Sequence, residues 1–321
     1  MKKISILVLI GILNLNIIGL AAKKNKVNKT EKTEISNTNN ENKKSIRDRF
    51  FKKKDKDSWE LVWNDEFDGD TLDLSKWSYW DNDYPSKNGN FIDENGNWVD
   101  QYGFKVKQYY LRDNVKVKDG NLTIELKKEE NKTVKIDGIN IKILYSSGAI
   151  HSKDKYSVKY GKIEMRAAMP KGIGVWPAFW TWPSDYAIKK IGDPAALEEI
   201  DIVEVYGDNL RKVTGTIHAL KSDSQYESFM GNNLKIKKNE NLLNFNTYAV
   251  EWNEKEIKWF FNGRNYKTIT MKEVGKKTDN TFKLPHYLII NVALKNTTGS
   301  DGDVEFPTEM KVDYVRVYKK K

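Results

Sequence analysis

The stretch Asn114-Val115-Lys116-Val117-Lys118-Asp119-Gly120-Asn121-Leu122-Thr123-Ile124-Glu125-Leu126 decides the fold class. Residues 114–118 alternate between polar and apolar side chains, and residues 121–126 do so again, which is the period of a strand with one buried face. Asp119-Gly120 between them is a turn signal. The stretch therefore predicts two antiparallel strands joined by a tight turn.

Short segments of alternating apolar and polar residues, separated by turn residues, continue along residues 58–321. A second predicted hairpin covers residues 248–261 and closes at Asn262-Gly263, and residues 314–318 end the chain as a strand. Few segments have the helical period of 3.6, and no repeat of fixed length is present. We predict one all-β domain, a β-sandwich or jelly roll, with one sheet free to curve into a ligand cleft. Such folds serve lectins, capsids and enzymes alike, so the fold alone does not give the function.

The first 57 residues differ from the rest. Residues 1–22 begin with two lysines after the initial Met, continue through an apolar run and end in small residues, which is the layout of a secretory signal peptide. Gly19 and Ala21 predict cleavage after residue 21. An uncleaved membrane anchor is the alternative, since the apolar segment is just long enough to span a bilayer. In both cases we expect export, to the medium or to the cell envelope.

Residues 22–57 are rich in Lys and Asn and poor in large apolar side chains, which predicts a disordered linker. A basic patch for an anionic envelope surface is the alternative. Of the 55 Lys and Arg and the 45 Asp and Glu in the chain, 15 and 6 lie in residues 1–57, which leaves 40 and 39 for residues 58–321. A nucleic-acid-binding domain would carry its basic excess on the folded part, so we exclude that class.

The chain has no cysteine and three histidines. A disulfide framework, thiolate chemistry, a Cys-ligated zinc and a lipid-modified N-terminal Cys are therefore excluded, and a His-rich metal centre is not expected. We assign structural roles to His151 and His286. The ten Trp and 16 Tyr fill a core or build stacking surfaces for sugars or nucleotides.

The segment Glu198-Glu199-Ile200-Asp201-Ile202-Val203-Glu204-Val205-Tyr206-Gly207 carries the chemistry. Its β-branched residues predict a strand. Side chains alternate along a strand, so Glu199 and Asp201 share one face while the isoleucines point to the other. One extra residue, inserted as a β-bulge at residues 202–203, would bring Glu204 onto the face of the other two acids. The sequence then predicts three carboxylates in a row.

Such a row costs free energy through like-charge repulsion and therefore points to function, with a cation site as the alternative. Glycoside hydrolysis needs one ionised and one neutral carboxyl group. With Glu199 as the ionised group, which acts as nucleophile, a hydrogen bond from Asp201 would hold Glu199 in place. The surrounding negative charge and partial burial would raise the pKa of Glu204. The three groups would titrate as a cluster.

The segment from Glu199 to Glu204 resembles the catalytic motif of glycoside hydrolase family 16, in the variant with one additional residue and a β-bulge, as in laminarinases, agarases and carrageenases. The resemblance covers most of residues 58–321. It extends to these motifs, in the family's order: Trp63-Asn64-Asp65-Glu66-Phe67, Asp119-Gly120-Asn121-Leu122, Tyr145-Ser146-Ser147-Gly148, Tyr160-Gly161-Lys162-Ile163-Glu164, Gly174-Val175-Trp176-Pro177-Ala178-Phe179-Trp180, Gly215-Thr216-Ile217-His218 and Val312-Asp313-Tyr314-Val315-Arg316-Val317-Tyr318.

This resemblance implies a jelly-roll β-sandwich of the concanavalin A-like type, with the motif strand lining a concave carbohydrate-binding cleft. It implies a retaining double displacement, with Glu199 as nucleophile, Glu204 as acid/base and Asp201 as their partner. In a retaining site the two reacting carboxyl groups lie about 5–5.5 Å apart. No organic cofactor is implied.

The resemblance also suggests residues that bind substrate. Asn114, His218 and Asn291 match polar cleft positions, where a side chain can bond sugar hydroxyls. Trp176 and Trp180 match sugar-stacking positions, with Trp180 the stronger match. Core packing is the alternative for the two tryptophans, and satisfying a buried neighbour is the alternative for His218.

Glu66, Asp313 and the carbonyl of Gly120 resemble the structural Ca²⁺ site on the convex face of many members, and hard oxygen ligands suit this ion. Exposed acids that bind only water are the alternative. The sequence also departs from the family at two places. Ala149 stands where members often carry Arg, and Lys295-Asn296-Thr297-Thr298-Gly299-Ser300 stands where laminarinases commonly have Gly-Gly-Asn-Trp-Pro-Gly.

These observations predict an exported, endo-acting, retaining hydrolase of a β-glycan, with β-1,3- or β-1,3-1,4-glucan as the first choice of substrate. Agarose or carrageenan is the alternative substrate, and transglycosylation is the alternative reaction. A catalytically silent lectin-like module is the alternative from another class. We expect a polysaccharide partner, no nucleic acid, a monomer, and membrane contact only if the N-terminal segment is not cleaved.

Overall fold

The computed structural model describes residues 59–80, 91–92, 98–99, 105–136, 139–184, 198–220, 226–229, 233–278, 282–295 and 304–321. The chain divides into two units between Asp57 and Ser58, and all of these residues belong to the second unit. The predicted signal peptide (1–21) and linker (22–57) lie outside the described residues and stay predictions. In the part of the chain that is described, no helix has the length and apolar character needed to cross a bilayer.

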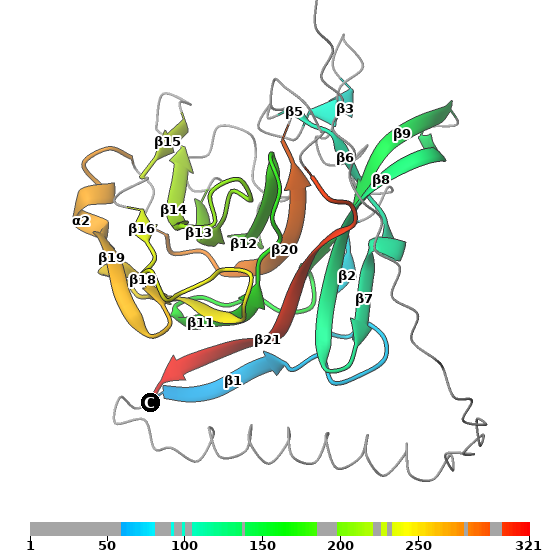
Figure 1. The fold of residues 1–321 in the computed structure, drawn as a ribbon. Helices are drawn as coiled ribbons and strands as arrows, with labels where there is room; N and C mark the ends of the chain where they lie inside the picture. Colours follow the sequence, from blue (N-terminus) through cyan, green and yellow to red (C-terminus); the bar gives the residue numbers. More distant parts are fainter. Residues whose placement is uncertain are drawn as a thin grey trace, which may run out of the picture. The chain divides into compact units, whose positions relative to one another are not determined.

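The described residues form two large, mostly antiparallel sheets and one small sheet (Figure 1). The first large sheet has ten strands: β19 (Arg264–Thr270), β18 (Glu256–Phe261), β17 (Asn246–Trp252), β11 (Gly161–Ala168), β21 (Thr308–Lys320), β8 (Asn121–Ile136), β9 (Ile139–Ser147) and β6 (Gln108–Tyr110) in this order, with β1 (Trp59–Asp65) beside β21 and β7 (Val115–Lys118) beside β8.

The second large sheet has eight strands: β15 (Tyr226–Ser228), β14 (Lys212–Leu220), β13 (Glu198–Glu204), β12 (Val175–Pro183), β20 (His286–Leu294), β10 (Ala149–His151) and β2 (Ser78–Tyr79), with β16 (Leu234–Lys235) beside β14. The small sheet contains β3 (Phe91–Ile92), β4 (Trp98–Val99) and β5 (Lys105–Val106). Helical structure among the described residues is limited to η1 (Arg112–Asn114) and α2 (Met271–Val274).

The predicted hairpins are confirmed. Strands β7 and β8 pair in antiparallel register from Val115↔Ile124 to Lys118↔Asn121. The turn between them places Asp119 at φ 54° and Gly120 at φ 70°, the left-handed conformation that a two-residue turn of this hand requires at both positions. Strand β8 then runs on to Ile136, well beyond the predicted Leu126, because β9 pairs with its second half.

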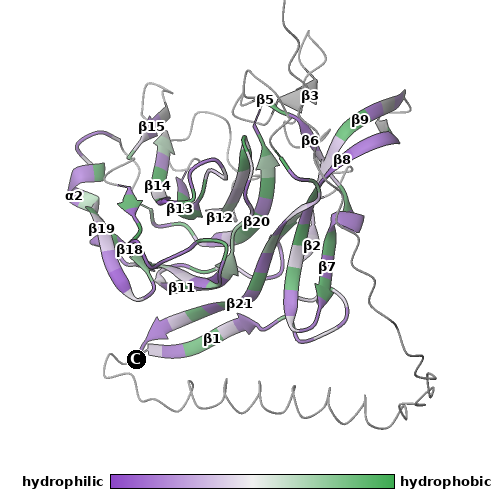
Figure 2. Cartoon of the chain, in the orientation of Figure 1, coloured by the Kyte–Doolittle hydropathy of each residue, from purple (hydrophilic) through white to green (hydrophobic). Residues whose placement is uncertain are grey.

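One hydrophobic core joins the two large sheets. Its buried members come from both, for example Phe179 and Ile200 of the eight-stranded sheet and Ile163, Trp252 and Trp259 of the ten-stranded sheet. Hydrophobic and hydrophilic residues alternate along β7 and β21 (Figure 2), as expected for strands with one face on a core. We call the other face of the eight-stranded sheet, which points away from this core, the site face.

Candidate active site

The three predicted acids lie on β13, and the strand register shows the predicted β-bulge. Against β14, Asp201 pairs with Thr216 and Glu204 pairs with Thr214, so three steps along β13 match two steps along β14. Against β12, the register shifts at the same place. Ile202 and Val203, although adjacent, both belong to the core cluster. The extra residue resets the alternation, and Glu204 joins Asp201 on the site face.

Asp201 is the centre of the group. Its side chain is 96% buried and forms a hydrogen bond with Glu199. Burial raises the pKa of Asp201 well above its usual range, and the charge of Glu204 adds to this rise, while the hydrogen bond with Glu199 opposes it. Glu199 itself is half-buried, so its carboxylate is accessible at the site face and is oriented by the bond to Asp201.

His218 lies beside this pair. It pairs with Glu199 across β13 and β14. Its Nε2 is 3.1 Å from Oδ2 of Asp201, and its Nδ1 is 2.7 Å from the hydroxyl oxygen of Ser228 on β15. Glu199, Asp201 and His218 each offer one ligand atom within 4.8 Å of the others, which among the described residues is the one such group that could hold a metal ion. The imidazole thus lies between Ser228 and the acids, within ion-pair distance of Asp201.

Glu204 has a different environment from Glu199. It is 7% exposed, and burial raises the pKa of its carboxyl group. His218, a hydrogen bond from Trp176 and the ammonium groups of Lys295 and Lys267 act in the opposite direction on the same pKa. Indole Nε1 of Trp176 donates to Oε1 of Glu204 over 2.9 Å. Burial is the largest of these effects, so Glu204 tends to keep its proton.

The predicted tryptophans lie on the site face and not in the main core. Trp180 pairs with Asp201 across β12 and β13, and residues that pair directly across strands share a face. Trp176 lies four residues away on β12 and therefore on the same face. Val175 and Phe179, at odd positions of the same strand, point to the opposite face and belong to the core cluster. The sequence left open whether the two rings pack in the core or face the site, and the strand register places both on the site face.

Trp180 and Asn291 form an aromatic and polar group on β12 and β20. Indole Nε1 of Trp180 donates to Oδ1 of Asn291 over 2.8 Å, and Nδ2 of Asn291 donates to the hydroxyl of Tyr110 over 3.0 Å. Trp80 lies 6.2 Å from Trp180 and 6.3 Å from Tyr110 between ring centroids. These half-buried rings provide an apolar surface with a buried amide at its base, which suits a sugar ring.

A cation lies next to Trp176. The ammonium of Lys295 is 3.9 Å from the ring centroid of Trp176 and 4.4 Å from that of Tyr206, and the two rings stack at 5.9 Å. It also donates to the Tyr206 hydroxyl over 3.2 Å. Lys295 thus covers part of the ring that holds Glu204, so this tryptophan serves Glu204 more directly than it serves a sugar.

Asn114 does not join these residues. It is 1% exposed, and its amide nitrogen donates to the carbonyl of Glu125 over 2.8 Å and to the hydroxyl of Ser146 over 3.0 Å. These bonds tie η1 to β8 and β9 in the ten-stranded sheet. Because the amide is buried and its donors are taken, we correct our expectation for Asn114 and assign it a structural role.

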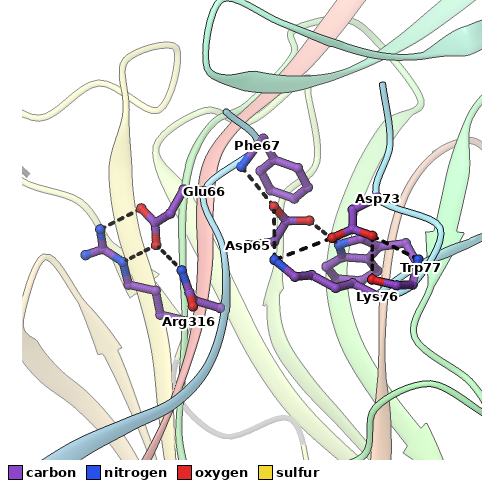
Figure 3. A network of polar contacts seen from close by, with 9 residues as sticks. Asp65, Glu66, Phe67, Asp73, Lys76, Trp77 and Arg316 are labelled. Carbon is purple, nitrogen blue, oxygen red and sulfur yellow. Dashed lines mark hydrogen bonds and ion pairs between the residues drawn. The ribbon is translucent and has the colours of Figure 1, made fainter. Parts of the chain in front are cut away.

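The residues of the predicted calcium site are arranged differently from a cation site. The carboxylate of Glu66 receives two hydrogen bonds from Arg316, of 2.9 and 2.8 Å (Figure 3), and Asp313 receives one from Arg166 over 2.6 Å. Gly120 is in the turn between β7 and β8. Each carboxylate is already neutralised by a guanidinium group, so this arrangement does not fit Ca²⁺, and the ion stays a prediction.

The two other histidines are both buried, and their structural roles stay predictions. His286 is fully buried, with Nδ1 2.8 Å from the hydroxyl of Thr181 and Nε2 3.3 Å from Glu198. His151 is 6% exposed and packs edge-on against Trp80 and Tyr287. Glu198, the fourth acid of the motif, therefore belongs to the sandwich interior and not to the site.

Several residues in or around the site were not predicted from the sequence: Trp80, Tyr110, Tyr206, Ser228, Lys267 and Lys295. They come from six separate segments, and no local pattern marks any of them except Tyr206. Lys295 was visible only as a departure from a family motif. Tyr206 follows the acid motif directly, and its position two residues after Glu204 was the one available signal.

Comparison with known proteins agrees with this geometry. The family described as Glycosyl hydrolases family 16 matches residues 104–316. The chain is 34% identical over 271 residues to the glucan endo-1,3-beta-glucosidase A1 of Niallia circulans, covering 81% of this chain but 38% of that protein. It is 31% identical to the beta-glucanase of Rhodothermus marinus, covering 81% of this chain and 85% of that one.

Solved structures give the same relationship. The catalytic domain of an endo-1,3-beta-glucanase (laminarinase) from Thermotoga petrophila superposes with a TM-score of 0.70 at 30% identity. The match covers 83% of this chain and 99% of that one. The similarity extends across the whole catalytic domain of the Thermotoga protein, and it confirms the predicted jelly-roll fold.

Proposed function

Because the chain belongs to glycosyl hydrolase family 16, we propose that it is an endo-acting hydrolase of β-1,3- or β-1,3-1,4-glucan that retains the configuration of the anomeric carbon. The observation that carries this proposal is the bulged strand β13, which brings Glu204 to the face of Glu199 and Asp201. The relatives named above supply the substrate class.

In the first step the Glu199 carboxylate attacks the anomeric carbon. Glu204 gives its proton to the glycosidic oxygen, the bond between that oxygen and the sugar breaks, and a glycosyl ester of Glu199 forms. In the second step Glu204, now ionised, takes a proton from water while the water oxygen attacks the same carbon. Glu199 is released as a carboxylate, and Glu204 is protonated again.

The environments of the two glutamates support these roles. Burial of Glu204 raises its pKa and favours the protonated acid at the start. Trp176 occupies Oε1 of Glu204, which leaves Oε2 for the leaving-group oxygen. Asp201 bonds to Glu199 and orients it, and His218 lies beside Asp201 on the next strand.

The substrate-binding surface follows from the aromatic group. Trp180, with Trp80 and Tyr110 beside it, would stack against glucosyl rings, and Asn291 and His218 would bond sugar hydroxyls. A neutral glucan suits these residues, because rings and neutral amides form most of the surface.

A second substrate class is favoured by Lys295. Its ammonium lies within the group that surrounds Glu204, where it would pair with a sulfate or carboxylate on the sugar. A hydrolase of an anionic galactan, such as carrageenan, is therefore the alternative.

We propose that the protein is exported, on the basis of residues 1–21, and that it acts as a monomer without an organic cofactor. N-terminal sequencing of the protein recovered from the producing cells tests cleavage after residue 21. Recovery of residues 1–21 in a membrane fraction would favour the anchor.

The proposed function is tested by reducing-end release from laminarin, mixed-linkage β-glucan, agarose and carrageenan, with Glu199→Gln as the matched control. We expect release from laminarin or mixed-linkage glucan, loss of that release in the variant, and the β-anomer as the first product in ¹H NMR. Release from carrageenan alone would favour the galactan alternative. Binding of a glycan without any release would point to a lectin-like module, and an α-anomer formed first would overturn the retaining mechanism.

A further inference from the structure

The bulge in β13 affects the hydrogen bonding of the main chain, and the carbonyl of Asp201 next to it receives a donor from outside the sheet. Between Asp201 and Glu204 the ladder to β14 is interrupted, because three residues on one strand oppose two on the other. A bulge leaves backbone groups outside the regular ladder, and a buried carbonyl without a donor costs free energy. The partner for Asp201 comes from the opposite sheet.

That partner is Trp259 on β18. Its side chain is fully buried in the core between the sheets, and its Nε1 donates to the carbonyl oxygen of Asp201 over 2.7 Å. The bond is short and well desolvated, and it joins the residue directly before the bulge to the ten-stranded sheet. Its acceptor is the main chain of the acid that lies between Glu199 and Glu204.

Gly215 on β14 leaves the space that the indole of Trp259 occupies. It lies between Thr214 and Thr216, the two residues that face the bulge. A Cβ atom at Gly215 would be 2.2 Å from Cδ1 and 2.5 Å from Nε1 of Trp259, far inside van der Waals contact. A glycine within a strand often marks the close approach of another group, and here the group is the one that bonds to the bulge.

Lys267 on β19 completes the arrangement. Its side chain is buried, its ammonium lies 4.9 Å from the ring centroid of Trp259, and it donates to the carbonyl oxygens of Gly215 and Phe229. Burial lowers the pKa of Lys267 to about 8, while the charges of Asp201 and Glu204 oppose this. The ring thus lies between Gly215 of β14 and the ammonium of Lys267, which bonds to the carbonyl of the same glycine.

We propose that Trp259 is a positioning residue, which holds the β-bulge through the Asp201 carbonyl and so keeps Glu204 beside Asp201 on the site face. This inference rests on the proposed function and adds a residue that touches no substrate. Without the indole N–H, the bulge relaxes, and Glu204 moves toward solvent and away from its partners.

The test compares two buried tryptophans. Trp259→Phe removes the N–H and keeps an aromatic ring. Trp252→Phe is the matched control, because Trp252 is also buried in the core, at 1% exposure, but its Nε1 has no hydrogen-bond partner among the described residues. Both variants lose an indole from the same core, so a general loss of packing affects them alike.

We expect Trp259→Phe to lower kcat on laminarin about 10- to 100-fold with KM within about twofold of wild type, because the loss concerns the geometry of the reacting groups. Trp252→Phe should keep kcat within about threefold. In Trp259→Phe the basic limb of the rate profile should move to lower pH, since a better-solvated Glu204 loses its proton earlier. Equal kcat values in the two variants would overturn the proposal.

A carboxyl titration by ¹³C NMR separates this inference from the proposed function, because it needs no substrate. The ionisable groups that face Glu204 are Asp201 on β13, His218 on β14, Tyr266 and Lys267 on β19, and Tyr206 and Lys295 at the ends of β13 and β20. None of them is changed in either variant. We expect a lower Glu204 pKa in Trp259→Phe alone, and an unchanged value would overturn the proposal even if no glycan is cleaved.

Should Trp259→Phe fail to fold, β-(3-benzothienyl)alanine at position 259 replaces the N–H by sulfur with nearly the same shape. The same loss of kcat and the same change in pKa are then expected from a folded protein. Wild-type values from that protein would contradict the role of the hydrogen bond.

Discussion

Trp176 donates a hydrogen bond of 2.9 Å from its indole Nε1 to Oε1 of Glu204. The two residues come from neighbouring strands, β12 and β13, and both are on the site face. The bond stabilises the ionised form of Glu204 and so lowers its pKa, against the larger effect of burial. The ring therefore reduces the proton affinity of Glu204 and orients its carboxyl group.

The Trp176→Phe variant removes this bond, so we expect the pKa of Glu204 to rise. The proposed acid must be protonated at the start, and a higher pKa keeps it so at higher pH. The basic limb of kcat/KM should therefore move to higher pH, while kcat falls about tenfold. Trp180→Phe is the control, since its N–H bonds to Asn291, and it should raise KM without moving the limb. A basic limb that moves equally in both variants would contradict this role for Trp176.

Lys295→Met removes a cation that also lowers the pKa of Glu204. We expect the basic limb to move to higher pH here too, and the shift to shrink in high salt, because the interaction is between charges. Lys311→Met changes a half-exposed lysine on β21 and should leave the profile as it is. Activity lost on carrageenan but kept on laminarin would assign Lys295 to an anionic substrate instead.

The buried acids reduce stability at neutral pH. Burial raises the pKa of Asp201, so the folded state binds its proton more tightly than the unfolded state does. The stability from this group is fully present below the unfolded pKa of about 3.9, and it is lost as the pH rises through the folded pKa.

Asp201→Asn should therefore raise the Tm at pH 7, by about 2–4 °C for each 1 kcal/mol gained, and the gain should vanish below about pH 4. Asp73→Asn is the control of opposite sign, because hydrogen bonds from Ser75 lower the pKa of Asp73. Calorimetry at several pH values measures both variants. A lower Tm for Asp201→Asn at pH 7 would mean that the carboxylate supports the fold.

The pair of Glu66 and Arg316 should stabilise the sandwich without a metal. The two side chains are 15% and 10% exposed and share two hydrogen bonds (Figure 3). We expect Arg316→Met to lower the free energy of unfolding by about 2–4 kcal/mol, because the half-buried Glu66 loses both guanidinium bonds and keeps the one from Asn64. Lys171→Met, whose partner Glu305 is largely exposed, should leave the free energy of unfolding almost unchanged. Urea unfolding measures both.

The same arrangement predicts the effect of calcium. Because Arg316 and Arg166 already neutralise Glu66 and Asp313, EDTA should leave the Tm of the wild-type protein unchanged, and added Ca²⁺ should not raise it. A rise of several degrees with Ca²⁺ would support the cation site that the sequence suggested, and the arginines would then have to move.

Much of this protein is determined by local sequence. Alternation and the Asp119-Gly120 turn predicted the hairpin of β7 and β8, since strand period and turn chemistry act over a few residues. The parity of residues 199–204 required an insertion if all three acids were to share a face, and the register places the bulge at residues 202–203. Both inferences use only properties of residues that are close together in the sequence.

Tertiary structure decided whatever depends on partners distant in sequence. The spacing of Trp176 and Trp180 shows that they share a face of the strand but not which face. Only the pairing of β12 with β13 shows that this is the site face and not the core. Asn114 lost its proposed role because Glu125 and Ser146 take its donors. Glu66 and Asp313 lie beside arginines that no local pattern assigns to them. Trp259 reaches Asp201 from 58 residues away. Strand period is a property of neighbouring residues, whereas a hydrogen bond between two sheets exists only once both sheets have formed and packed.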